Sequence, residues 1–473
     1  MKIAENRPFD ELQIGDEASI ERVCTEDDFY VFANMSGNHN PLHLLRYDGD
    51  GDGQPEAVAP AMWVGSLISA VLGNILPGAG TLYRRQSFEF VGQAHAGDDL
   101  VARVRVADKR ADGDVVLATT VTRKGDGATI LRGEAVVQAP REKLSFEELE
   151  VPGLVVQRHR HFEQLIRLAE PLDPIPTAVV APEEPNALGG ALLAMDHTII
   201  APLLVGHRPR LEAAAAAIGR TLDGAEIVDV EDHAHAGTLA ANLAVDLVAD
   251  GRARALMKGH LHTDDLLRAC LRRERGLRTG RRLTHVFVMD VPGVSHPLLV
   301  SDAAINIAPD LETKADIVQN AIDVALSIGI EAPKVGVLSA VETVNTQIPS
   351  SVDAALLAKM ADRGQIRGGL VDGPLAMDNA LDLAAARTKG IHSPVAGRAE
   401  ILVVPGIDAG NMLAKQLSIV AKAEGAGIVV GARVPIILTS RADGDQARLA
   451  SCAVAALHDA RLSGKAPFAT ERR

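Results

Sequence analysis

The strongest constraint on the fold of this chain is a regular alternation of short apolar runs and alanine-rich stretches that begins near residue 158. Apolar runs of this length, separated by helical stretches, are typical of βαβ units in which helices cover both faces of a parallel sheet. The sequence therefore predicts a mostly parallel, doubly wound α/β sheet. Its strands are expected at TAVVAP, APLLVG, AEIVDV, RALMKG, HVFVMD, KVGVLSA, GGLVDG, EILVVPG and VPIILTS.

Residues 1 to about 140 have a different pattern of apolar and polar residues. One apolar helical stretch, PAMWVGSLISAVLG, is followed by alternating apolar and polar residues in SFEFVGQAH, DDLVARVRVADKR, DVVLATTVTRKGDG and TILRGEAVVQAP. A period of two indicates strands, and the Gly-Asp pairs between these runs indicate turns. One helix followed by a meander of strands predicts a sheet wrapped around a helix. We expect this domain over 1–142, a charged, proline-bearing linker over 143–157 and the α/β domain over 158–473.

Composition limits the kind of protein. Only 3% of the 473 residues are aromatic although 47% are hydrophobic, so Ala, Val, Leu and Gly must build the interior. The formal charge of −14 argues against a nucleic-acid-binding surface. The N-terminus lacks the apolar core of a signal peptide, and no apolar run is long enough to span a bilayer. We expect a cytoplasmic globular protein without a membrane or nucleic-acid partner.

Several patterns resemble ligand sites but have simpler explanations. The acidic run DGDGDG at 48–53 has the spacing of a calcium loop, but Ala59 stands where the bidentate glutamate belongs, so we expect a solvated turn. The run GAGIVVG at 425–431 lacks the acidic residue of a dinucleotide site and is interpreted as a helix end turning into a strand. No metal site is expected from the scattered cysteines or from histidine pairs that lack a third ligand: Cys24, Cys270, Cys452, His159/His161, His233/His235 and His260/His262.

Six polar loops follow successive strands of the predicted α/β sheet. In an open α/β sheet, ligands bind at the carboxyl ends of the strands, where helix N-termini offer free N–H groups to a phosphate. Lysine, arginine, histidine and hydroxyl side chains collect in these loops, and this set suits an oxyanion or a phosphate ester. The loops are KGHLHT (258–263), GVSHPLLVSDAAIN (293–306), LSAVETVNTQIPS (338–350), VDGPLAMDNA (371–380), PGIDAGNMLAKQ (405–416) and TSRADGDQ (439–446).

The motifs KGxxxT, SH…DAAIN, VDGPLAMDNA, PGIDAGNMLAKQ and VPIILTSRAD resemble those of the phosphate acetyl/butyryltransferase family over about residues 158–465. The resemblance implies the reaction acyl-CoA + phosphate ⇌ acyl phosphate + CoA, with no bound cofactor and no metal. It also implies a bilobed, doubly wound fold like that of isocitrate and isopropylmalate dehydrogenases. Lobe 1 would comprise about 158–300 and 429–473, and lobe 2 about 301–428.

The resemblance also implies roles for individual residues. In that family a serine–arginine pair after a late strand meets the transition state, and a following aspartate takes the thiol proton. Carried over to this sequence, Ser440 would donate to the oxyanion or orient the thiol, and Arg441 would hold the phosphate by a bidentate contact. Asp443 is the base, with Asp445 as the alternative. The residues expected to bind CoA and phosphate in the cleft between the lobes are Lys258, Thr263, Ser295, His296, Asp302, Asn306, Asp372, Asn411 and Lys415.

The loop SGNHNPLH at 36–43 and the stretch SLISAVLGNILPGAGT resemble MaoC-like (R)-specific enoyl-CoA hydratases over about residues 10–140, which implies an α+β hotdog fold. In that family an aspartate and a histidine act on one water. The histidine is His43, but the aspartate position holds Asn38, whose carboxamide cannot accept a proton. Ala61 stands where a glycine N–H polarises the thioester carbonyl, and it keeps that N–H. We expect an assembly or acyl-CoA-binding module without turnover.

Taken together, the two halves resemble bifunctional enoyl-CoA hydratase/phosphate acetyltransferases. We predict a homo-oligomeric phosphate acyltransferase whose partners are acyl-CoA, CoA, inorganic phosphate and acyl phosphate. The alternative is a fully bifunctional enzyme that also hydrates enoyl-CoA. Two other hypotheses stay open: a dehydrogenase of the same bilobed fold and a non-enzymatic scaffold. The missing dinucleotide fingerprint counts against the dehydrogenase.

Overall fold

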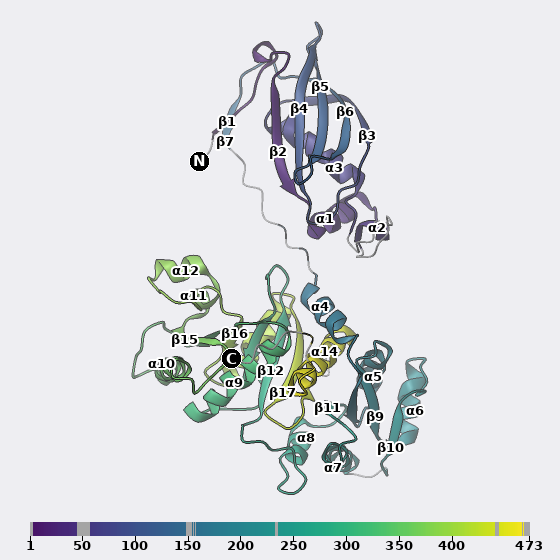
Figure 1. The fold of residues 1–473 in the computed structure, drawn as a ribbon, viewed down its shortest axis with the longest axis vertical. Coiled ribbons are helices and arrows are strands. Elements are labelled where there is room, and N and C mark those ends of the chain that lie inside the picture. Colours follow the sequence, from purple (N-terminus) through teal and green to yellow (C-terminus); the bar gives the residue numbers. More distant parts are fainter. Residues whose placement is uncertain are drawn as a thin grey trace. The chain divides into compact units, whose positions relative to one another are not determined.

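A computed structural model of the chain divides into two compact units, Met1–Val156 and Gln157–Arg473, and each is described by itself (Figure 1). The acidic run at 48–53 and the candidate catalytic residues Ser440, Arg441 and Asp443 lie outside the described residues. The structure describes residues 3–44, 57–147, 154, 156, 158–231, 235–439, 444–465 and 467.

The N-terminal unit is a five-stranded antiparallel sheet that packs along one long helix, α3 (Figure 1). The strand order is β2-β4-β5-β6-β3. Small elements precede and follow this sheet, and β1 pairs with β7. The bounds are β1 (Ile3–Glu5), η1 (Phe9–Glu11), β2 (Glu17–Val23), α1 (Glu26–Ser36), α2 (Pro41–Leu44), α3 (Ala61–Asn74), β3 (Leu82–Phe90), β4 (Asp99–Lys109), β5 (Asp114–Arg123), β6 (Thr129–Gln138) and β7 (Ser145–Glu147).

The predicted helix inside a sheet is confirmed, because Trp63, Ile68 and Val71 of α3 are buried in one cluster with the inward side chains of β4, β5 and β6. The sheet is not a simple meander, since β3 pairs with β6 rather than with β4. The prediction also missed β2, whose residues are mostly exposed and therefore lack a clear apolar alternation. Pairing with β4 makes it a strand.

The predicted linker over 143–157 begins too early. Ser145–Glu147 form β7, which pairs with β1 and belongs to the N-terminal unit. The charged composition of this stretch hid the strand, because a short exposed strand is specified by its backbone partner rather than by an apolar face. The boundary between the two units follows Val156.

The described residues of the C-terminal unit form one eleven-stranded sheet in the order β10-β9-β8-β11-β18-β17-β12-β13-β16-β14-β15. The two flanks are parallel, which confirms the predicted mostly parallel sheet. In the middle, β17 runs antiparallel to both β18 and β12, and β12 runs antiparallel to β13. The strands are β8 (Ile175–Val180), β9 (Ile200–Gly206), β10 (Glu226–Asp229), β11 (Ala255–Lys258), β12 (Thr284–Asp290), β13 (Leu298–Ser301), β14 (Lys334–Leu338), β15 (Leu370–Leu375), β16 (Ile401–Val403), β17 (Glu424–Val430) and β18 (Ile436–Ile437).

Helices cover both faces of this sheet, as the doubly wound prediction requires. One buried cluster joins α5, α9 and α14 to one face, and a second joins α7 and α8 to the other. Helix α14 is the most enclosed, since every residue from Ala447 to Ala460 is buried. The helices are α4 (Arg160–Ala169), α5 (Pro185–Asp196), α6 (Arg208–Ala217), α7 (Ala236–Ala249), α8 (Thr263–Cys270), α9 (Leu311–Ser327), α10 (Pro349–Asp362), α11 (Met377–Leu381), α12 (Leu383–Thr388), α13 (Ile407–Ile419) and α14 (Asp445–Leu462).

The interpretation of GAGIVVG as a helix end turning into a strand is wrong. Helix α13 ends at Ile419, and Gly425–Val430 all lie in β17. Three glycine and alanine residues at the start of the run conceal its strand character, because these residues have low strand propensity. The strand forms because it lies between β12 and β18 and is hydrogen-bonded to both.

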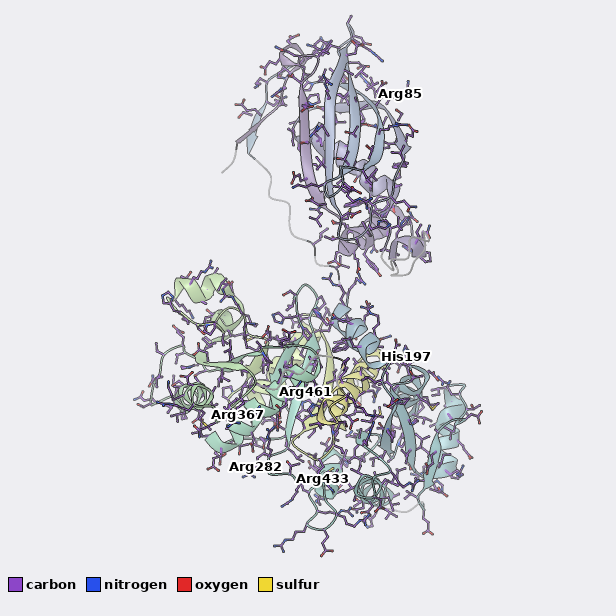
Figure 2. All side chains as sticks on the ribbon, viewed as in Figure 1. Arg85, His197, Arg282, Arg367, Arg433 and Arg461 are labelled. Carbon is purple, nitrogen blue, oxygen red and sulfur yellow. The ribbon has the colours of Figure 1, made fainter. Side chains whose placement is uncertain are left out.

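Most arginines lie at the surface, as exposed Arg85, Arg282 and Arg433 illustrate (Figure 2). Among the described residues, only three lysine or arginine side chains are buried: Lys258 (8% exposed), Lys314 (6%) and Arg448 (4%). A buried cation is costly unless something nearby compensates its charge. Lys314 has an obvious counter-ion in Asp353, whose carboxylate lies 2.6 Å from its ammonium. Lys258 and Arg448 line a common pocket, described below.

The three cysteines, Cys24, Cys270 and Cys452, are free and buried. Burial raises the pKa of each thiol to about 12, so none of them is a thiolate nucleophile near neutral pH. Within the described part of the chain, none of the helices is both long and apolar enough to cross a membrane.

A buried histidine on α14 predicts how stability depends on pH. Burial lowers the pKa of His458 to about 4, against an ordinary value near 6.5. Above about pH 6.5 the imidazole is neutral in both the folded and the unfolded chain, so its contribution is fully present. As the pH falls from 6.5 toward 4, the unfolded chain binds a proton that the folded chain does not, and stability is lost. Urea unfolding of the C-terminal unit should give a lower free energy at pH 5.5 than at 6.5, with a smaller difference for His458→Gln.

Candidate active site

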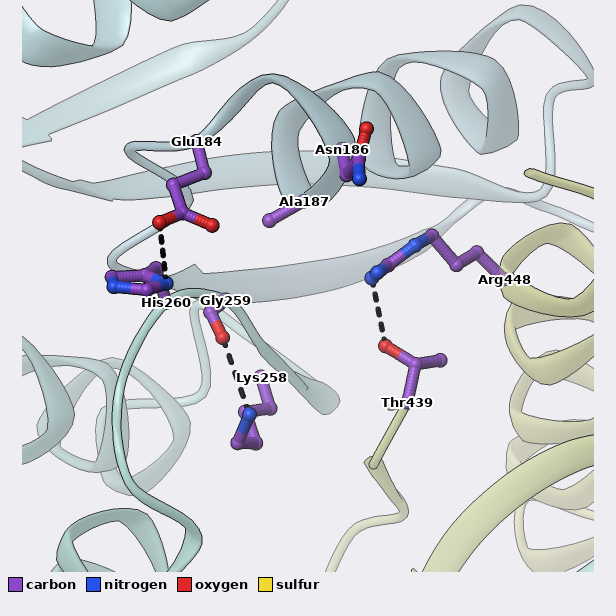
Figure 3. Close-up of a pocket in the computed structure, with 8 residues that line it drawn as sticks. All are labelled: Glu184, Asn186, Ala187, Lys258, Gly259, His260, Thr439 and Arg448. Carbon is purple, nitrogen blue, oxygen red and sulfur yellow. Dashed lines mark hydrogen bonds and ion pairs between the residues drawn. The ribbon is translucent and has the colours of Figure 1, made fainter. Parts of the chain in front are cut away.

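The two buried cations meet in a small pocket at the carboxyl ends of β11 and β18 (Figure 3). Lys258 is the last residue of β11, and Thr439 follows β18. These strands pair in parallel, so their carboxyl ends share one edge of the sheet. The first turn of α5 closes another side. The lining residues are Glu184, Asn186, Ala187, Lys258, Gly259, His260, Thr439 and Arg448.

Arg448 enters this pocket from the first turns of α14. Its Nη1 donates a hydrogen bond of 2.9 Å to Thr439 Oγ1. The side chain passes close to α5, where a Cβ on Gly190 would lie 2.5 Å from Arg448 Cδ. Glycine at position 190 therefore makes room for the arginine. Sequence reasoning missed Arg448, although a lone arginine within a stretch of alanine, serine and cysteine that is otherwise apolar was a detectable signal.

Lys258 and its neighbours form the opposite wall of the pocket. Lys258 Nζ donates to the Gly259 carbonyl at 3.4 Å. His260 Nδ1 lies 2.9 Å from Glu184 Oε1, so this exposed histidine ties the loop after β11 to the N-terminus of α5 (Figure 3). Among the described residues, no group of three or more His, Cys, Asp or Glu side chains could hold a metal ion.

The pocket brings together groups of both charges. The largely buried ammonium of Lys258 and guanidinium of Arg448 line it together with the Thr439 hydroxyl, the Glu184 carboxylate and the first turn of α5. Cations interact with an anion far more strongly in such an environment than in water, and helix N-termini add further N–H donors. Thr439 immediately precedes Ser440 and Arg441, and the alternative base Asp445 is the exposed first residue of α14.

Three further predicted residues lie at the same edge of the sheet. Thr263 is the first residue of α8, the helix that follows β11. Ser295 lies with His296 in the loop that joins β12 to β13, and His296 Nδ1 lies 3.2 Å from the Pro297 carbonyl. Because β12 and β18 are both antiparallel to β17, their carboxyl ends point the same way.

The structure does not bring Asp302 and Asn306 to that edge. They follow β13, which runs back along β12, so they lie at the opposite end of this hairpin from Ser295 and His296. Asp302 is 2% exposed, and its carboxylate accepts hydrogen bonds from the backbone N–H groups of residues 304–306 and, at 2.6 Å, from Asn306 Nδ2. These contacts shape the loop after β13.

The three candidates that were expected in lobe 2, namely Asn411, Lys415 and Asp372, do not line the pocket. Asn411 on α13 reaches the Asp302 loop, since its Nδ2 donates to the Ala303 carbonyl at 3.4 Å. Lys415 is exposed one turn further along α13. Asp372 lies on β15, the outermost strand of this flank, and accepts a hydrogen bond from the Gly373 N–H.

In the N-terminal unit, Asn38 and His43 are both engaged in local hydrogen bonds. Asn38 is exposed, and its Oδ1 accepts from the Asn40 N–H at 3.2 Å. His43 Nδ1 lies 2.8 Å from the Val58 carbonyl, which leaves Nε2 as its other polar atom. Ala61 begins α3 and is exposed. A cavity of about 400 Å³ lies between α3 and β3, with Met62, Gly65, Ser66, Ser69, Tyr83, Arg84, Arg85, Gln86 and Phe88 around it.

Comparisons with known proteins agree with the division of the chain into an N-terminal and a C-terminal unit. Residues 237–456 match the family model described as "Phosphate acetyl/butaryl transferase", and residues 12–126 match the "MaoC like domain". A phosphate acetyltransferase of Rhizobium meliloti is 55% identical over 300 residues, which are 63% of this chain and 94% of that protein. The chain belongs to the phosphate acetyl/butyryltransferase family.

Other members of the family extend this likeness. A phosphate butyryltransferase of Clostridium beijerinckii is 41% identical over 302 residues, which are 64% of this chain and 99% of that protein. The crystal structure of a branched-chain phosphotransacylase from Enterococcus faecalis V583 is similar with a TM-score of 0.52 and 32% identity, covering 60% of this chain and 99% of that one. The chain is therefore an acyltransferase with a MaoC-like hotdog domain before a phosphate acetyl/butyryltransferase-like α/β domain.

Proposed function

We propose that the C-terminal unit catalyses acyl-CoA + phosphate ⇌ acyl phosphate + CoA at the pocket between Lys258 and Arg448. The observation that carries this proposal is the pair of buried cations directly beside Thr439, the residue before Ser440 and Arg441. Two largely buried cations suit a phosphate, whose negative charges they would balance. The likeness to acetyl- and butyryltransferases supports the same reaction.

The proposed chemistry needs neither a metal nor a covalent enzyme intermediate. In the direction of acyl-CoA formation, the CoA sulfur attacks the carbonyl carbon of the acyl phosphate while Asp443 takes the thiol proton. The C–S bond forms, the C–O bond to phosphate breaks, and phosphate leaves with the electron pair. Ser440 donates to the oxyanion, and Arg441 binds the phosphate in a bidentate way. Lys258 and Arg448 add positive charge where the phosphate departs.

The test is release of free CoA from acetyl-, butyryl- and longer acyl-CoAs, measured with a thiol reagent with and without inorganic phosphate. We expect release that depends on phosphate and yields acyl phosphate. Release at the same rate without phosphate would instead reveal a thioesterase, and reduction of a nicotinamide with these substrates would favour the dehydrogenase hypothesis. The chain-length series measures the acyl preference.

For the N-terminal unit we propose acyl-CoA binding without efficient hydration. Support comes from Asn38, whose carboxamide cannot take a proton from water and is engaged in a local turn with Asn40. Met62, Tyr83 and Phe88 give the cavity between α3 and β3 an apolar surface that would accommodate an acyl chain, and serine, arginine and glutamine side chains complete its lining. A fully bifunctional enzyme remains the second candidate, since His43 is present.

The substitution Asn38→Asp is expected to create or raise hydratase activity, because it restores a carboxylate that can accept the proton of a water. We expect the loss of enoyl absorbance from crotonyl-CoA to accelerate at least about tenfold relative to the unmodified chain. Asn40→Asp, two residues away in the same loop, is the matched control and should have no effect. Rapid hydration by the unmodified chain would favour the bifunctional alternative.

Three further properties remain predictions: a homo-oligomeric state, a cytoplasmic location, and the bilobed arrangement of isocitrate and isopropylmalate dehydrogenases. Light scattering of the purified full chain measures the first. A mass equal to one chain, 49.9 kDa, would contradict it.

A further inference from the structure

The imidazole of His285 on β12 extends past the neighbouring strand β17 toward the end of β18. His285 is on β12, and Gly427 lies on the neighbouring strand β17, close to where the ring passes. A Cβ built on Gly427 would stand 2.9 Å from His285 Nε2 and 2.6 Å from the Leu438 carbonyl oxygen. Real Cβ atoms do not come so close, so a side chain at this position would displace either the ring or the strand. Glycine thus leaves the space in which His285 approaches Leu438.

The protonation of His285 fits a hydrogen bond to this carbonyl. The side chain is 1% exposed, and burial lowers its pKa to about 4 although nearby Asp302 and the Leu438 carbonyl act in the opposite direction. The ring is therefore neutral at neutral pH and carries one N–H. Among the described residues, Nδ1 has no hydrogen-bond partner. The proton belongs on Nε2, which donates to the Leu438 oxygen.

Two contacts from α14 hold residues at this end of the neighbouring strands β17 and β18. Arg448 Nη1 donates to Thr439 Oγ1 at 2.9 Å. The Gly427 N–H, opposite Leu438, donates to Ser451 Oγ at 3.1 Å. His285 is itself anchored, because Ser301 Oγ donates to its carbonyl at 2.9 Å. The last two residues before Ser440 are therefore held by buried side chains from two different elements.

We propose that His285 is a positioning residue for the acyl transfer: its imidazole fixes Leu438 at the carboxyl end of β18, just before the predicted catalytic residues Ser440 and Arg441 in the sequence. The inference rests on the proposed function and adds a residue that does not touch the substrate. Misplacement of a reacting group by about 1 Å can cost a large factor in rate, so a buried contact two residues upstream is enough to matter.

The test compares His285→Leu with His285→Gln in the full chain. Leucine removes the donor, whereas the glutamine amide restores an N–H close to the position of Nε2. For phosphate-dependent CoA release we expect His285→Leu to lower kcat about tenfold, with the KM values for acyl-CoA and phosphate changed less than about twofold. His285→Gln should keep kcat within about threefold of the unmodified chain. If His285→Leu does not fold, His285→Asn, whose amide is too short, takes its place.

The matched control is His458→Gln. His458 is another buried imidazole, 6% exposed, and its Nδ1 lies 2.9 Å from Ser327 Oγ, away from β18. It should alter stability but leave kcat per folded molecule unchanged. An unchanged kcat in the donor-free variant, a rise in KM alone, or an equal loss of kcat in His458→Gln would overturn the inference. An unmodified chain without phosphate-dependent release would instead overturn the proposed function.

Discussion

Replacing either buried cation of the pocket by methionine is expected to remove most of the phosphate-dependent acyl transfer. Lys258→Met and Arg448→Met should each lower kcat/KM about 100-fold, because each deletes a largely buried charged donor. Methionine keeps most of the side-chain volume, so the pocket should stay packed. Release of CoA from butyryl-CoA at several phosphate concentrations measures the effect, and part of it should appear as a higher KM for phosphate.

The control for this prediction is the third buried cation, Lys314. Its ion pair with Asp353 at 2.6 Å joins α9 to α10, and neither helix contributes to the pocket lining. Lys314→Met leaves a carboxylate without its partner, so the free energy of unfolding should fall by about 3 kcal/mol while kcat/KM per folded molecule stays unchanged. If this variant loses as much activity per folded molecule as Lys258→Met, the pocket has no special role.

The second large effect is expected at Arg441. Arg441→Ala should lower kcat/KM about 1000-fold, because the phosphate loses its bidentate donor in the transition state. Arg441→Lys should recover little of this loss, since an ammonium cannot make two parallel hydrogen bonds to one phosphate. The same CoA-release assay measures both variants, and circular dichroism checks that they fold.

Arg433 supplies the matched control for Arg441. It is exposed (Figure 2), and its Nη2 donates to the Gly276 carbonyl at 2.8 Å, so its role is confined to a surface loop. Arg433→Ala and Arg433→Lys should both retain full activity. Equal activity of Arg441→Lys and the unmodified chain would contradict bidentate phosphate binding and would point to a simple charge effect.

Much of the fold was predictable because the spacing of apolar residues along the sequence indicates helices and strands locally. Apolar runs between helical stretches indicated a doubly wound sheet, and the period of two indicated the antiparallel sheet around α3. The failures have a common cause. Strands β2 and β7 are short or exposed, and β17 begins with glycine and alanine. Such strands are specified by their partners across the sheet, which no local pattern reveals.

The candidate site was predictable only in part. Lys258 was found because it ends an apolar run and begins a polar loop, a position where ligands bind in α/β sheets. Arg448 and His285 were missed because each lies inside a regular element, where a polar residue is usually structural. The expectation that Ser295 and Asp302 line one cleft ignored β13, whose return along β12 places them at opposite ends of a hairpin.

The sequence by itself determined the two kinds of hydrophobic pattern, the family and a candidate set of polar loop residues, since motifs and hydrophobic periods depend only on nearby residues. Only the tertiary structure decided which of these groups meet. Arg448 reaches the pocket because β18 inserts beside β11 and α14 then packs across the sheet. His285 reaches Leu438 because a glycine lies on the strand between them. The order of strands in the sheet and the absence of a side chain at Gly427 depend on residues far apart in the sequence. For this reason no local pattern shows that Arg448 and His285 lie near the end of β18.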